Sequence, residues 1–491
     1  MSIHLTTPST IRLVGYEEKR AALEAELTYT DKRKEFEYQK ARKSNFLIQK
    51  LGHKAYEEHL KELKSQIKKC LLFQDDQGLW TYSGFSTRLA KAFDDQVSEE
   101  NLFPKHDQIP WQNTPNRTLR PYQEEAVHLL LERRHGAVEI GTGLGKTAII
   151  EALVKEIGLK AVVMAPSKSI ASQIHKEFEY HFGKKRVGYF GDGKKDFKKL
   201  IVVAIAASLT KVQEGSPAWK ELSKAQVFVA DESHLTPAAT LQKVCFGLMS
   251  EVPYRFFFSG TQLRNDGLGL LLEAITGDIV FRMSVREGVD QGYLAKPIFK
   301  MFGCKSDSDF ESRDVNAMTR AHFYYNQNVI NRVANLANMS VEILGRPTLI
   351  LIDEMEQFAR LLPKLHHKFG FAHGPITKQN KDKIPARFHE SDPNRLVDDF
   401  NAGKFKLLIG TSCISTGTDI KVASHIINWV GGKSEIQIKQ GVGRGTRLCQ
   451  GKVDCFVTDF DVENVDVLSR HAEERCEVYD SIYGPVTRIG V

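Results

Sequence analysis

Short apolar runs alternate with segments of helical periodicity through most of the chain. Between residues 117 and 285 the runs lie at 137–140, 161–165, 201–206, 226–230 and 255–258. A second series, which begins after residue 295, lies at 348–352, 370–373, 407–410, 425–429 and 454–458. Continuous apolar strands between helices are typical of parallel sheets that are covered on both faces. The pattern therefore predicts an α/β protein with two lobes of similar size that face a cleft.

The first 115 residues follow a different pattern. Alternating residues at 3–5 and 10–14 predict two strands, and residues 70–82 predict a hairpin. Between them, apolar residues recur at helical spacing: Phe46, Leu47, Leu51, Leu60, Leu63 and Ile67. Residues 101–116 are rich in Pro, Asn and Gln, as in a linker. We therefore expect a small α+β accessory domain with its linker at 1–115, a first lobe at 116–290 and a second lobe at 291–491.

The composition is that of a globular protein. The 491 residues are 42% hydrophobic and 26% charged, which suits two or three domains. No apolar run reaches about 18 residues, and no basic segment followed by an apolar one opens the chain, so neither a transmembrane helix nor a secretory leader is expected. The seven cysteines include no CxxC pair, which favours reduced thiols in the cytoplasm over disulfides or a zinc site.

Positive charge is concentrated in two stretches. The formal net charge is only +7, but residues 31–70 hold twelve Lys/Arg against six Asp/Glu, and residues 184–199 hold seven against two. Focused positive charge suits a polyphosphate partner such as nucleic acid. Charged helices are also often no more than solvated faces, so both interpretations stay open.

Residues 139–147, with the sequence EIGTGLGKT, lie between an expected strand and an expected helix. A strand, a glycine-rich turn and a helix N-terminus form a phosphate cradle, because backbone N–H groups and the helix dipole converge there. Lys146 would pair with the β- and γ-phosphates, and Thr147 would hold Mg²⁺. Ile140 stands where such loops usually carry their first glycine. The expected nucleotide-binding residues are Gly141, Thr142, Gly143, Gly145, Lys146 and Thr147.

Two carboxylates, Asp231 and Glu232, follow the apolar run at 226–230. A carboxylate at the carboxyl edge of a parallel strand, beside a phosphate loop, can hold Mg²⁺, and we assign this role to Asp231. Glu232 can polarise the attacking water as a general base. An Asp-Glu pair after a strand is often only a turn, but here it lies in the same lobe as Lys146.

The sequences GTGLGKT and DESH, together with Ser259-Gly-Thr261, resemble motifs I, II and III of superfamily 2 helicases. This resemblance implies two tandem RecA-like lobes, ATP and Mg²⁺ as cofactors, and a nucleic-acid partner. Residues 119–123 (LRPYQ) resemble the upstream motif whose glutamine reads the adenine edge, which implies nucleotide contacts for Arg120 and Gln123.

Further motifs extend the resemblance into the second lobe. Residues 349–352 stand where motif IV would be, residues 410–420 are similar to motif V, and residues 440–447 (QGVGRGTR) resemble motif VI. The resemblance implies that Gly417 and Asp419 bind the nucleotide. It assigns catalytic roles to Gln440, Arg444 and Arg447, beside Lys146, Asp231 and Glu232. The arginines, three apart on a helix, would bring two guanidinium groups to the transition-state charge when the lobes close.

Residues 163–173 resemble motif Ia and residues 206–209 resemble the next nucleic-acid motif, so nucleic-acid contacts are implied for them and for motif V. They are expected to bind backbone phosphates, which carry no sequence information. These residues are Ser167, Gln173, Ser208, Thr411 and Ser412. Four aromatic residues could stack on bases at a junction, although such side chains are more often core. They are Trp80, Tyr82, Phe85 and Trp111.

Within the superfamily, the chain looks most like the phage recombination helicases of the UvsW type and their RecG- and XPB-like relatives. This implies a monomeric, ATP-dependent DNA helicase that unwinds or branch-migrates forked and junction DNA in replication, recombination or repair. It would work in the cytoplasm, that of the host if a phage encodes it. Two alternatives stay open: an RNA helicase, and an ATPase that moves along duplex DNA without separating strands. The Ser233-His234 pair, in place of the Ala-Asp of DEAD-box proteins, favours DNA.

Overall fold

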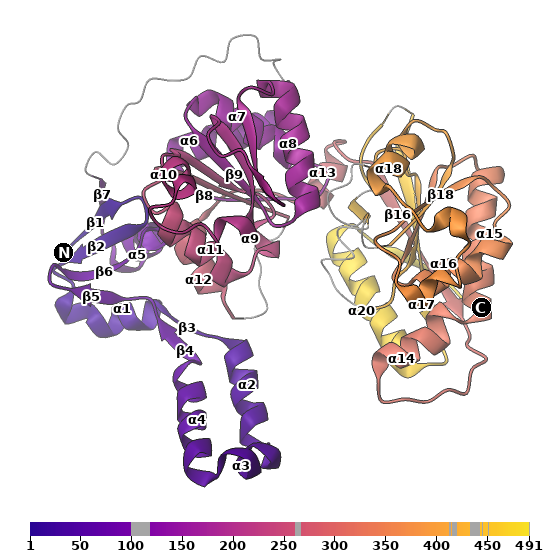
Figure 1. Cartoon of the computed structure of the whole chain (residues 1–491), viewed down its shortest axis with the longest axis horizontal. Helices are drawn as coiled ribbons and strands as arrows, with labels where there is room; N and C mark the ends of the chain where they lie inside the picture. Colours follow the sequence, from indigo (N-terminus) through magenta and orange to yellow (C-terminus); the bar gives the residue numbers. More distant parts are fainter. Residues whose placement is uncertain are drawn as a thin grey trace. The chain divides into compact units, whose positions relative to one another are not determined.

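The structure is a computed structural model of the 491-residue chain. It describes residues 1–99, 118–260, 267–411, 414, 420–432, 442–443, 445–449 and 451–490. Internal contacts divide the chain into two compact units (Figure 1). The first comprises Met1–Ile140 with Lys146–Arg282, and the second comprises Gly141–Gly145 with Met283–Val491.

The first lobe is built on an eight-stranded sheet. Its strands, in spatial order, are β11 (Lys194–Lys195), β10 (Val187–Gly191), β12 (Ile201–Ile205), β9 (Ala161–Ala165), β13 (Val227–Ala230), β14 (Tyr254–Ser259), β8 (His135–Ile140) and β15 (Ile279–Met283). The strands from β10 to β8 pair in parallel, and β11 pairs with β10 antiparallel. The helices are α6 (Pro121–Arg133), α7 (Lys146–Ile157), α8 (Lys168–Phe182), α9 (Ala206–Leu209), α10 (Pro217–Leu222), α11 (Ala238–Lys243) and α12 (Gly269–Thr276).

The second lobe contains a seven-stranded sheet whose strands pair in parallel. Their order is β18 (Phe369–Ala372), β19 (Leu407–Gly410), β17 (Thr348–Ile352), β20 (His425–Trp429), β21 (Asp454–Val462), β16 (Lys296–Cys304) and β22 (Val486–Ile489). The helices are α13 (Val285–Asp290), α14 (Val315–Thr319), α15 (Gln327–Glu342), α16 (Met355–Leu361), α17 (Lys378–Lys381), α18 (Pro393–Asn401) and α20 (Asp466–Ile482).

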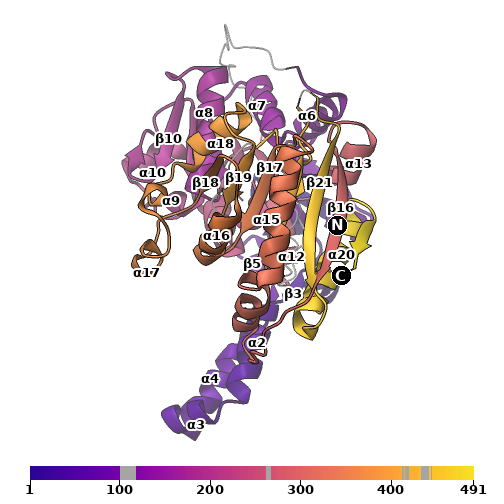
Figure 2. The ribbon, with the colours of Figure 1, turned by 90° about the vertical axis from the view of Figure 1, so that its right-hand side faces the viewer.

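Helices cover both faces of the second sheet, which explains its apolar strands. Helix α15 packs Val329 and Val333 into the core formed with β17 and β20, and it crosses the near face of the sheet in Figure 2. On the other face, Tyr479 of α20 stacks on Phe299 of β16, with ring centroids 4.6 Å apart. The expected α/β class with two parallel sheets is confirmed. In the described part of the chain, no helix has the length and apolar composition needed to cross a membrane.

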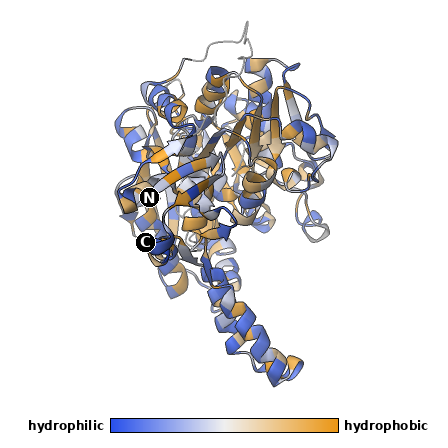
Figure 3. Cartoon of the chain, turned by 90° about the vertical axis from the view of Figure 1, so that its left-hand side faces the viewer, coloured by the Kyte–Doolittle hydropathy of each residue, from blue (hydrophilic) through white to orange (hydrophobic). Residues whose placement is uncertain are grey.

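The N-terminal residues form a separate sheet of five strands with a projecting arm. The strands are β5 (Phe73–Asp75), β6 (Gly78–Tyr82), β2 (Thr10–Val14), β1 (Ser2–Thr7) and β7 (Val97–Glu99), accompanied by α1 (Arg20–Glu26) and α5 (Ser86–Phe93). The arm, residues 28–70, consists of β3 (Thr28–Thr30), α2 (Lys32–Arg42), α3 (Asn45–Leu51), α4 (His53–Ser65) and β4 (Lys68–Cys70). Figure 3 shows mostly hydrophilic positions along the arm, with hydrophobic ones reaching its far end.

The N-terminal sheet is docked on the first lobe through buried and charged contacts. Arg88 of α5 binds both carboxylate oxygens of Glu273 on α12, at 2.6 and 2.7 Å. Buried Arg255 donates to the Ser9 hydroxyl at 2.7 Å, and Tyr82 stacks on Phe246 with ring centroids 3.9 Å apart. The accessory sheet and the first lobe therefore belong to one compact unit. The expected linker at 101–116 lies outside the described residues, and the three-part division stays a prediction.

Gly84 offers a test of this docking. A Cβ at this position would lie 2.5 Å from the Ala274 carbonyl oxygen of α12 and would also clash with that of Glu273. Gly84→Val is expected to lower the free energy of unfolding by about 1–3 kcal/mol, measured by urea denaturation, because backbone must move. Gly269→Ala on the same helix, where a Cβ meets nothing within 4 Å, should change it by less than about 0.5 kcal/mol. Equal stabilities would contradict the tight docking.

Candidate nucleotide site and nucleic-acid interface

The phosphate loop joins a buried strand to a buried helix. Strand β8 ends at Ile140, and α7 begins at Lys146. In the connecting turn, Gly143 has φ +88° and Gly145 has φ +79°, in the left-handed region where a side chain would be strained. The first turn of α7 therefore follows a tight bend, and its N–H groups, which have no acceptor within the helix, suit an anion. Thr147 is half-buried in that first turn.

Lys146 and Glu232 form an ion pair at the end of the sheet. The Lys146 Nζ lies 2.7 Å from Glu232 Oε1, and only 10% and 21% of the two side chains is exposed. Burial alone would raise the pKa of Glu232, but the Lys146 ammonium and His234 outweigh it and lower the pKa. The carboxylate is therefore held ionised, as a general base requires. Glu232 itself has φ +46°, so its backbone is strained at the point where the strand turns.

Asp231 is buried beside this pair. Burial, together with the adjacent Glu232 carboxylate, raises the pKa of Asp231 to about 7. Its Oδ1 has no hydrogen-bond partner among the described residues. A buried, unpartnered carboxylate oxygen is a donor that Mg²⁺ accepts, so the residues fit the ion. In the described part of the chain, no group of three His, Cys, Asp or Glu side chains is arranged so that it could hold a metal ion by itself. An ion here would thus depend on Asp231, Thr147 and the oxygens of a nucleotide.

Residues of the expected motif III contact those of motif II. The Ser259 hydroxyl lies 2.8 Å from His234 Nδ1, and the Ser233 hydroxyl donates to the Phe258 carbonyl at 3.2 Å. His234 Nδ1 is also 3.4 Å from Glu232 Oε2. Strand β14 is therefore linked to the candidate base through one imidazole. Thr261 lies outside the described residues.

Gln123 is buried at the start of α6. Its Oε1 accepts from the Arg120 N–H at 3.0 Å, and its Nε2 lies 3.4 Å from the Tyr122 hydroxyl. The Gln123 side chain thus caps α6, and its contacts with Arg120 and Tyr122 fix the orientation of its amide group. The roles of Arg120 and Gln123 toward adenine stay predictions.

The expected nucleic-acid residues of the first lobe emerge from one edge of its sheet. Ser167 follows β9 and caps α8, where its hydroxyl accepts from Ile170 N–H at 3.4 Å. Ser208 lies in α9 directly after β12, and Gln173 is half-buried on α8. Because β9, β12 and β13 are parallel, Ser167 and Ser208 leave the same edge as Asp231.

The structure divides the basic stretch at 184–199 between two edges of the sheet. Lys194 and Lys195 form β11 beside the end of β10, on the carboxyl edge, whereas Lys184 precedes β10 on the amino edge. Asp192, in the turn of this hairpin, forms an ion pair with Lys168, which follows Ser167. Both lysines of β11 are exposed. They extend the edge that carries Ser167, and the sequence pattern alone could not separate them from their neighbours.

In the second lobe only part of the expected set is described. Thr411 follows β19, is buried, and donates its N–H to the Ala372 carbonyl at 3.1 Å. Arg447 is half-buried, next to Thr446, whose carbonyl accepts from Ala295 N–H at 2.7 Å. The other five candidates lie outside the described residues: Ser412, Gly417, Asp419, Gln440 and Arg444. Their roles stay predictions.

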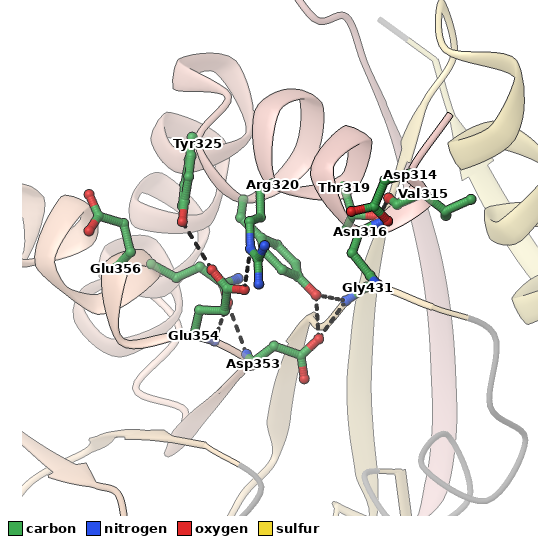
Figure 4. Close-up of polar contacts among 12 residues, drawn as sticks. Asp314, Val315, Asn316, Thr319, Arg320, Tyr325, Asp353, Glu354, Glu356 and Gly431 are labelled. Atoms are coloured by element: carbon green, nitrogen blue, oxygen red, sulfur yellow. Dashed lines mark hydrogen bonds and ion pairs between the residues drawn. The ribbon is translucent and has the colours of Figure 1, made fainter. Parts of the chain in front are cut away.

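A polar network that no motif indicated lies at the carboxyl ends of β17 and β20 (Figure 4). The Asp353 carboxylate accepts from the Tyr324 hydroxyl and, at 3.2 Å, from the Gly431 N–H. Desolvation by the neighbouring side chains raises the pKa of Asp353, although the residue itself is exposed. At the next residue, the Gly432 carbonyl accepts a hydrogen bond from Arg475 of α20 at 3.0 Å. The network therefore fixes the backbone just before the segment in which Gln440 and Arg444 are found.

The aromatic candidates for base stacking are already occupied by protein contacts. Trp80 stacks on Phe73 with ring centroids 4.5 Å apart, Tyr82 stacks on Phe246, and Phe85 is fully buried. Trp111 lies outside the described residues. The structure thus favours packing for the three described rings, since their apolar faces are covered by the N-terminal domain and the first lobe.

Models of known protein families match residues in both lobes. The model described as "Type III restriction enzyme, res subunit" matches residues 116–264, and the "Helicase conserved C-terminal domain" matches residues 334–449. The two occur in the same order as the motifs. The chain belongs to the superfamily 2 helicases. Membership of this family implies ATP-dependent activity and nucleic-acid binding.

Several known helicases are similar in sequence. The "DNA 3'-5' translocase XPB2" of Sulfurisphaera tokodaii is 27% identical over 206 residues, 40% of this chain and 42% of that protein. "Probable helicase D10" of Escherichia phage T5 is 27% identical, over 69% of this helicase and 70% of its own length. "Probable ATP-dependent RNA helicase DDX52" of Rattus norvegicus is 23% identical, over 70% and 55%. The helicase thus matches only about half the length of two of these relatives, 42% and 55%.

Solved structures support the fold. The type ISP restriction-modification enzyme LlaBIII bound to DNA matches 80% of the helicase and 33% of its own chain, with a TM-score of 0.53 and 15% identity. S. cerevisiae Dbp5 bound to RNA and ADP BeF3 matches 76% and 90%, with a TM-score of 0.51 and 16% identity. T4 UvsW aligns over 100% and 99%, at 13% identity and a TM-score of 0.42, a level that does not bear on the subgroup.

Proposed function

We propose that this helicase is an ATP- and Mg²⁺-dependent DNA motor that unwinds or branch-migrates forked and junction DNA. The observation that carries the proposal is the carboxyl edge of the first-lobe sheet. There Lys146 forms an ion pair with Glu232, and Asp231 has an oxygen with no partner among the described residues, on the same edge as Ser167 and Ser208. One edge thus offers groups for a nucleotide and groups for a phosphate backbone.

Hydrolysis would divide its tasks among these residues. Lys146 binds the phosphate tail, and Glu232, ionised beside it, takes a proton from the attacking water. Thr147 and Asp231 would hold Mg²⁺, which neutralises charge on the phosphates. The strained backbone at Glu232 and the bond from Ser259 to His234 fix the direction of the base. Arg444 and Arg447 supply positive charge to the transition state.

The nucleic-acid side is a set of phosphate contacts with little sequence preference. Ser167 and Ser208 offer hydroxyl groups beyond strand ends of the first lobe, and Lys194 and Lys195 add charge on the same edge. Thr411 of the second lobe is a further proposed contact. DNA is favoured over RNA because the DESH sequence departs from the DEAD-box signature, and because one relative is named a DNA translocase. The alternative, an RNA helicase, draws support from the RNA helicases among the relatives.

The experiment that tests the proposal compares ATPase rates with single-stranded DNA, blunt duplex, forked DNA, a four-way junction and RNA. Forked and junction DNA are expected to stimulate most, and gels should show strand displacement or junction migration. Preferential stimulation by RNA would select the alternative. Stimulation by duplex without strand separation would select a translocating ATPase. The absence of any nucleic-acid-stimulated hydrolysis would refute the motor.

The arm, with its surplus of positive charge, is proposed to hold the branched substrate. The helices of the arm can be removed while the ribbon at its base is kept. Strands β3 and β4 pair there, with Thr30 opposite Lys68, and the Asp31 N–H donates to the Ile67 carbonyl. Replacing residues 32–66 with Asn-Gly would close this ribbon with a two-residue turn. The variant is expected to bind forked DNA more weakly and to lose about 0.9 from the slope of log Kd against log salt for each phosphate contact removed. Unstimulated ATPase should remain, and unchanged DNA binding would remove the arm from the proposal.

A further inference from the structure

The far end of the arm is basic and carries no acid. Residues 42–54, called the arm tip below, contain Arg42, Lys43, Lys50 and Lys54 and no Asp or Glu. The six acidic residues of the arm all lie outside the tip, toward its base: Asp31, Glu35, Glu37, Glu57, Glu58 and Glu62. Positive charge is thus focused where the arm is farthest from its ribbon β3–β4 (Figure 1).

The arm tip also exposes large apolar side chains. Phe46 is 68% exposed and Leu51 is 40% exposed, whereas Leu47 and Ile48 on the same helix are half-buried. Helix α3 therefore turns one apolar side inward and leaves an aromatic ring outside. An exposed aromatic ring in a basic segment is suited to contact a partner rather than to form part of a core.

The tip is held in place from inside the arm. The buried Tyr56 of α4 directs its hydroxyl at the Ala41 and Arg42 carbonyls that end α2, at 3.2 and 3.1 Å. The Ser44 hydroxyl accepts from Leu47 N–H at 3.3 Å and caps α3. Phe46 is therefore presented on an ordered helix, so that a partner would bind without first ordering the tip.

Nucleic acid with unpaired bases matches this surface. Each nucleotide joins a flat apolar base to a phosphate, so a ring surrounded by cations can contact both at once. Bases inside a duplex are already stacked on their neighbours, and only single strands and branch points offer a free face. We propose that the arm tip binds DNA where bases are unpaired, with Phe46 stacked on a base and Arg42, Lys43 and Lys50 beside the adjoining phosphates. This proposal rests on the function proposed above and adds the recognised feature.

The test is Phe46→Ala in the full chain, with binding measured by fluorescence anisotropy on forked DNA and on blunt duplex of the same length. Loss of one base stack should weaken fork binding about 5- to 100-fold and leave blunt-duplex binding within about twofold. Phe46→Trp should restore fork binding, and Phe46→Leu, which keeps an apolar side chain, should not. All variants should have the same melting temperature as the wild type, because the Phe46 side chain is exposed.

Phe36 supplies the matched control. It is also 69% exposed and lies on the same arm, but on α2 between Glu35 and Glu37. Phe36→Ala should leave fork binding unchanged. Equal losses from both variants, or an equal loss on blunt duplex, would overturn the stacking role. A Phe46-dependent binding to anionic vesicles, or self-association that Phe46→Ala abolishes, without a change on forks would replace DNA by a membrane or a second copy.

The two proposals fail in different ways. If the unaltered helicase neither binds forks nor hydrolyses ATP in their presence, the proposed function is wrong. If it does both and Phe46→Ala behaves as the wild type does, only the role of the arm tip is wrong.

Discussion

Glu232→Gln is expected to lower the turnover number for ATP by about 10²–10⁴-fold, the usual contribution of a general base. The amide keeps the size of the side chain and can still accept from Lys146, 2.7 Å away, but it cannot take a proton. ATP and DNA should therefore still bind. Steady-state ATPase assays with forked DNA, paired with equilibrium binding of a fluorescent ATP analogue, measure both quantities. Lys146→Ala should abolish turnover and, unlike Glu232→Gln, should also weaken nucleotide binding, because it removes the proposed phosphate contact.

Glu221→Gln is the control for Glu232. Glu221 also pairs with lysines, Lys160 at 3.2 Å and Lys224 at 2.8 Å, but at the amino edge of the same sheet. Its loss should leave turnover unchanged. Normal stimulated hydrolysis by Glu232→Gln would remove Glu232 from the catalytic assignment, and a similar drop in both variants would mean that the effect comes from a weakened sheet.

The strands of the two lobes could be predicted because their environment is simple. All four residues of β13 are buried, so the strand is one uninterrupted apolar run. Two missed strands break that pattern. Strand β10 contains Gly188 and Gly191, and β16 alternates buried residues with half-buried ones such as Lys300. A strand need not be a continuous apolar run where it contains glycines or where one of its faces is partly exposed to solvent.

Helical periodicity predicted the helices of the arm but not their exposure. Phe46 and Leu51 fit the same spacing as Leu47, yet only Leu47 faces inward enough to be half-buried. The reason is geometric, since α3 lies at the far end of the arm and packs there against α4. Periodicity identifies a helix, but which apolar positions are covered depends on neighbours that lie far along the chain.

The candidate nucleotide site was predictable where one motif supplies one role. Lys146 and Glu232 are 86 residues apart in the sequence, but they follow strands that end at one edge of the sheet, and the two side chains do pair. The network of Tyr324, Asp353 and Gly431 has no such signature, because each residue comes from a different element. Contacts of that kind follow from the packed fold and from nothing local in the sequence.

Arg444→Ala is expected to lower the turnover number by about 10³–10⁵-fold, the effect of an arginine finger, with a much smaller change in ATP affinity. The reason is that charge on the transferred phosphoryl group grows as the transition state forms, so the guanidinium binds the transition state more strongly than the ground state. Arg447→Ala should act in the same direction. Arg444→Lys should recover little, since an ammonium lacks the planar fork of donors. Turnover and affinity are measured in the same ATPase and nucleotide-binding assays.

Arg470→Ala is the control, because Arg470 is an exposed arginine on α20 of the same lobe and should leave both quantities unchanged. Equal losses of turnover and affinity in Arg444→Ala would make Arg444 an ordinary nucleotide-binding residue. The polar network at Asp353 and Arg475 contacts the backbone directly before the segment that contains Arg444 in the sequence. It fixes the backbone at Gly431 and Gly432, and the segment that contains Arg444 begins there. If Arg444 acts as predicted, these hydrogen bonds anchor the described backbone from which its segment continues.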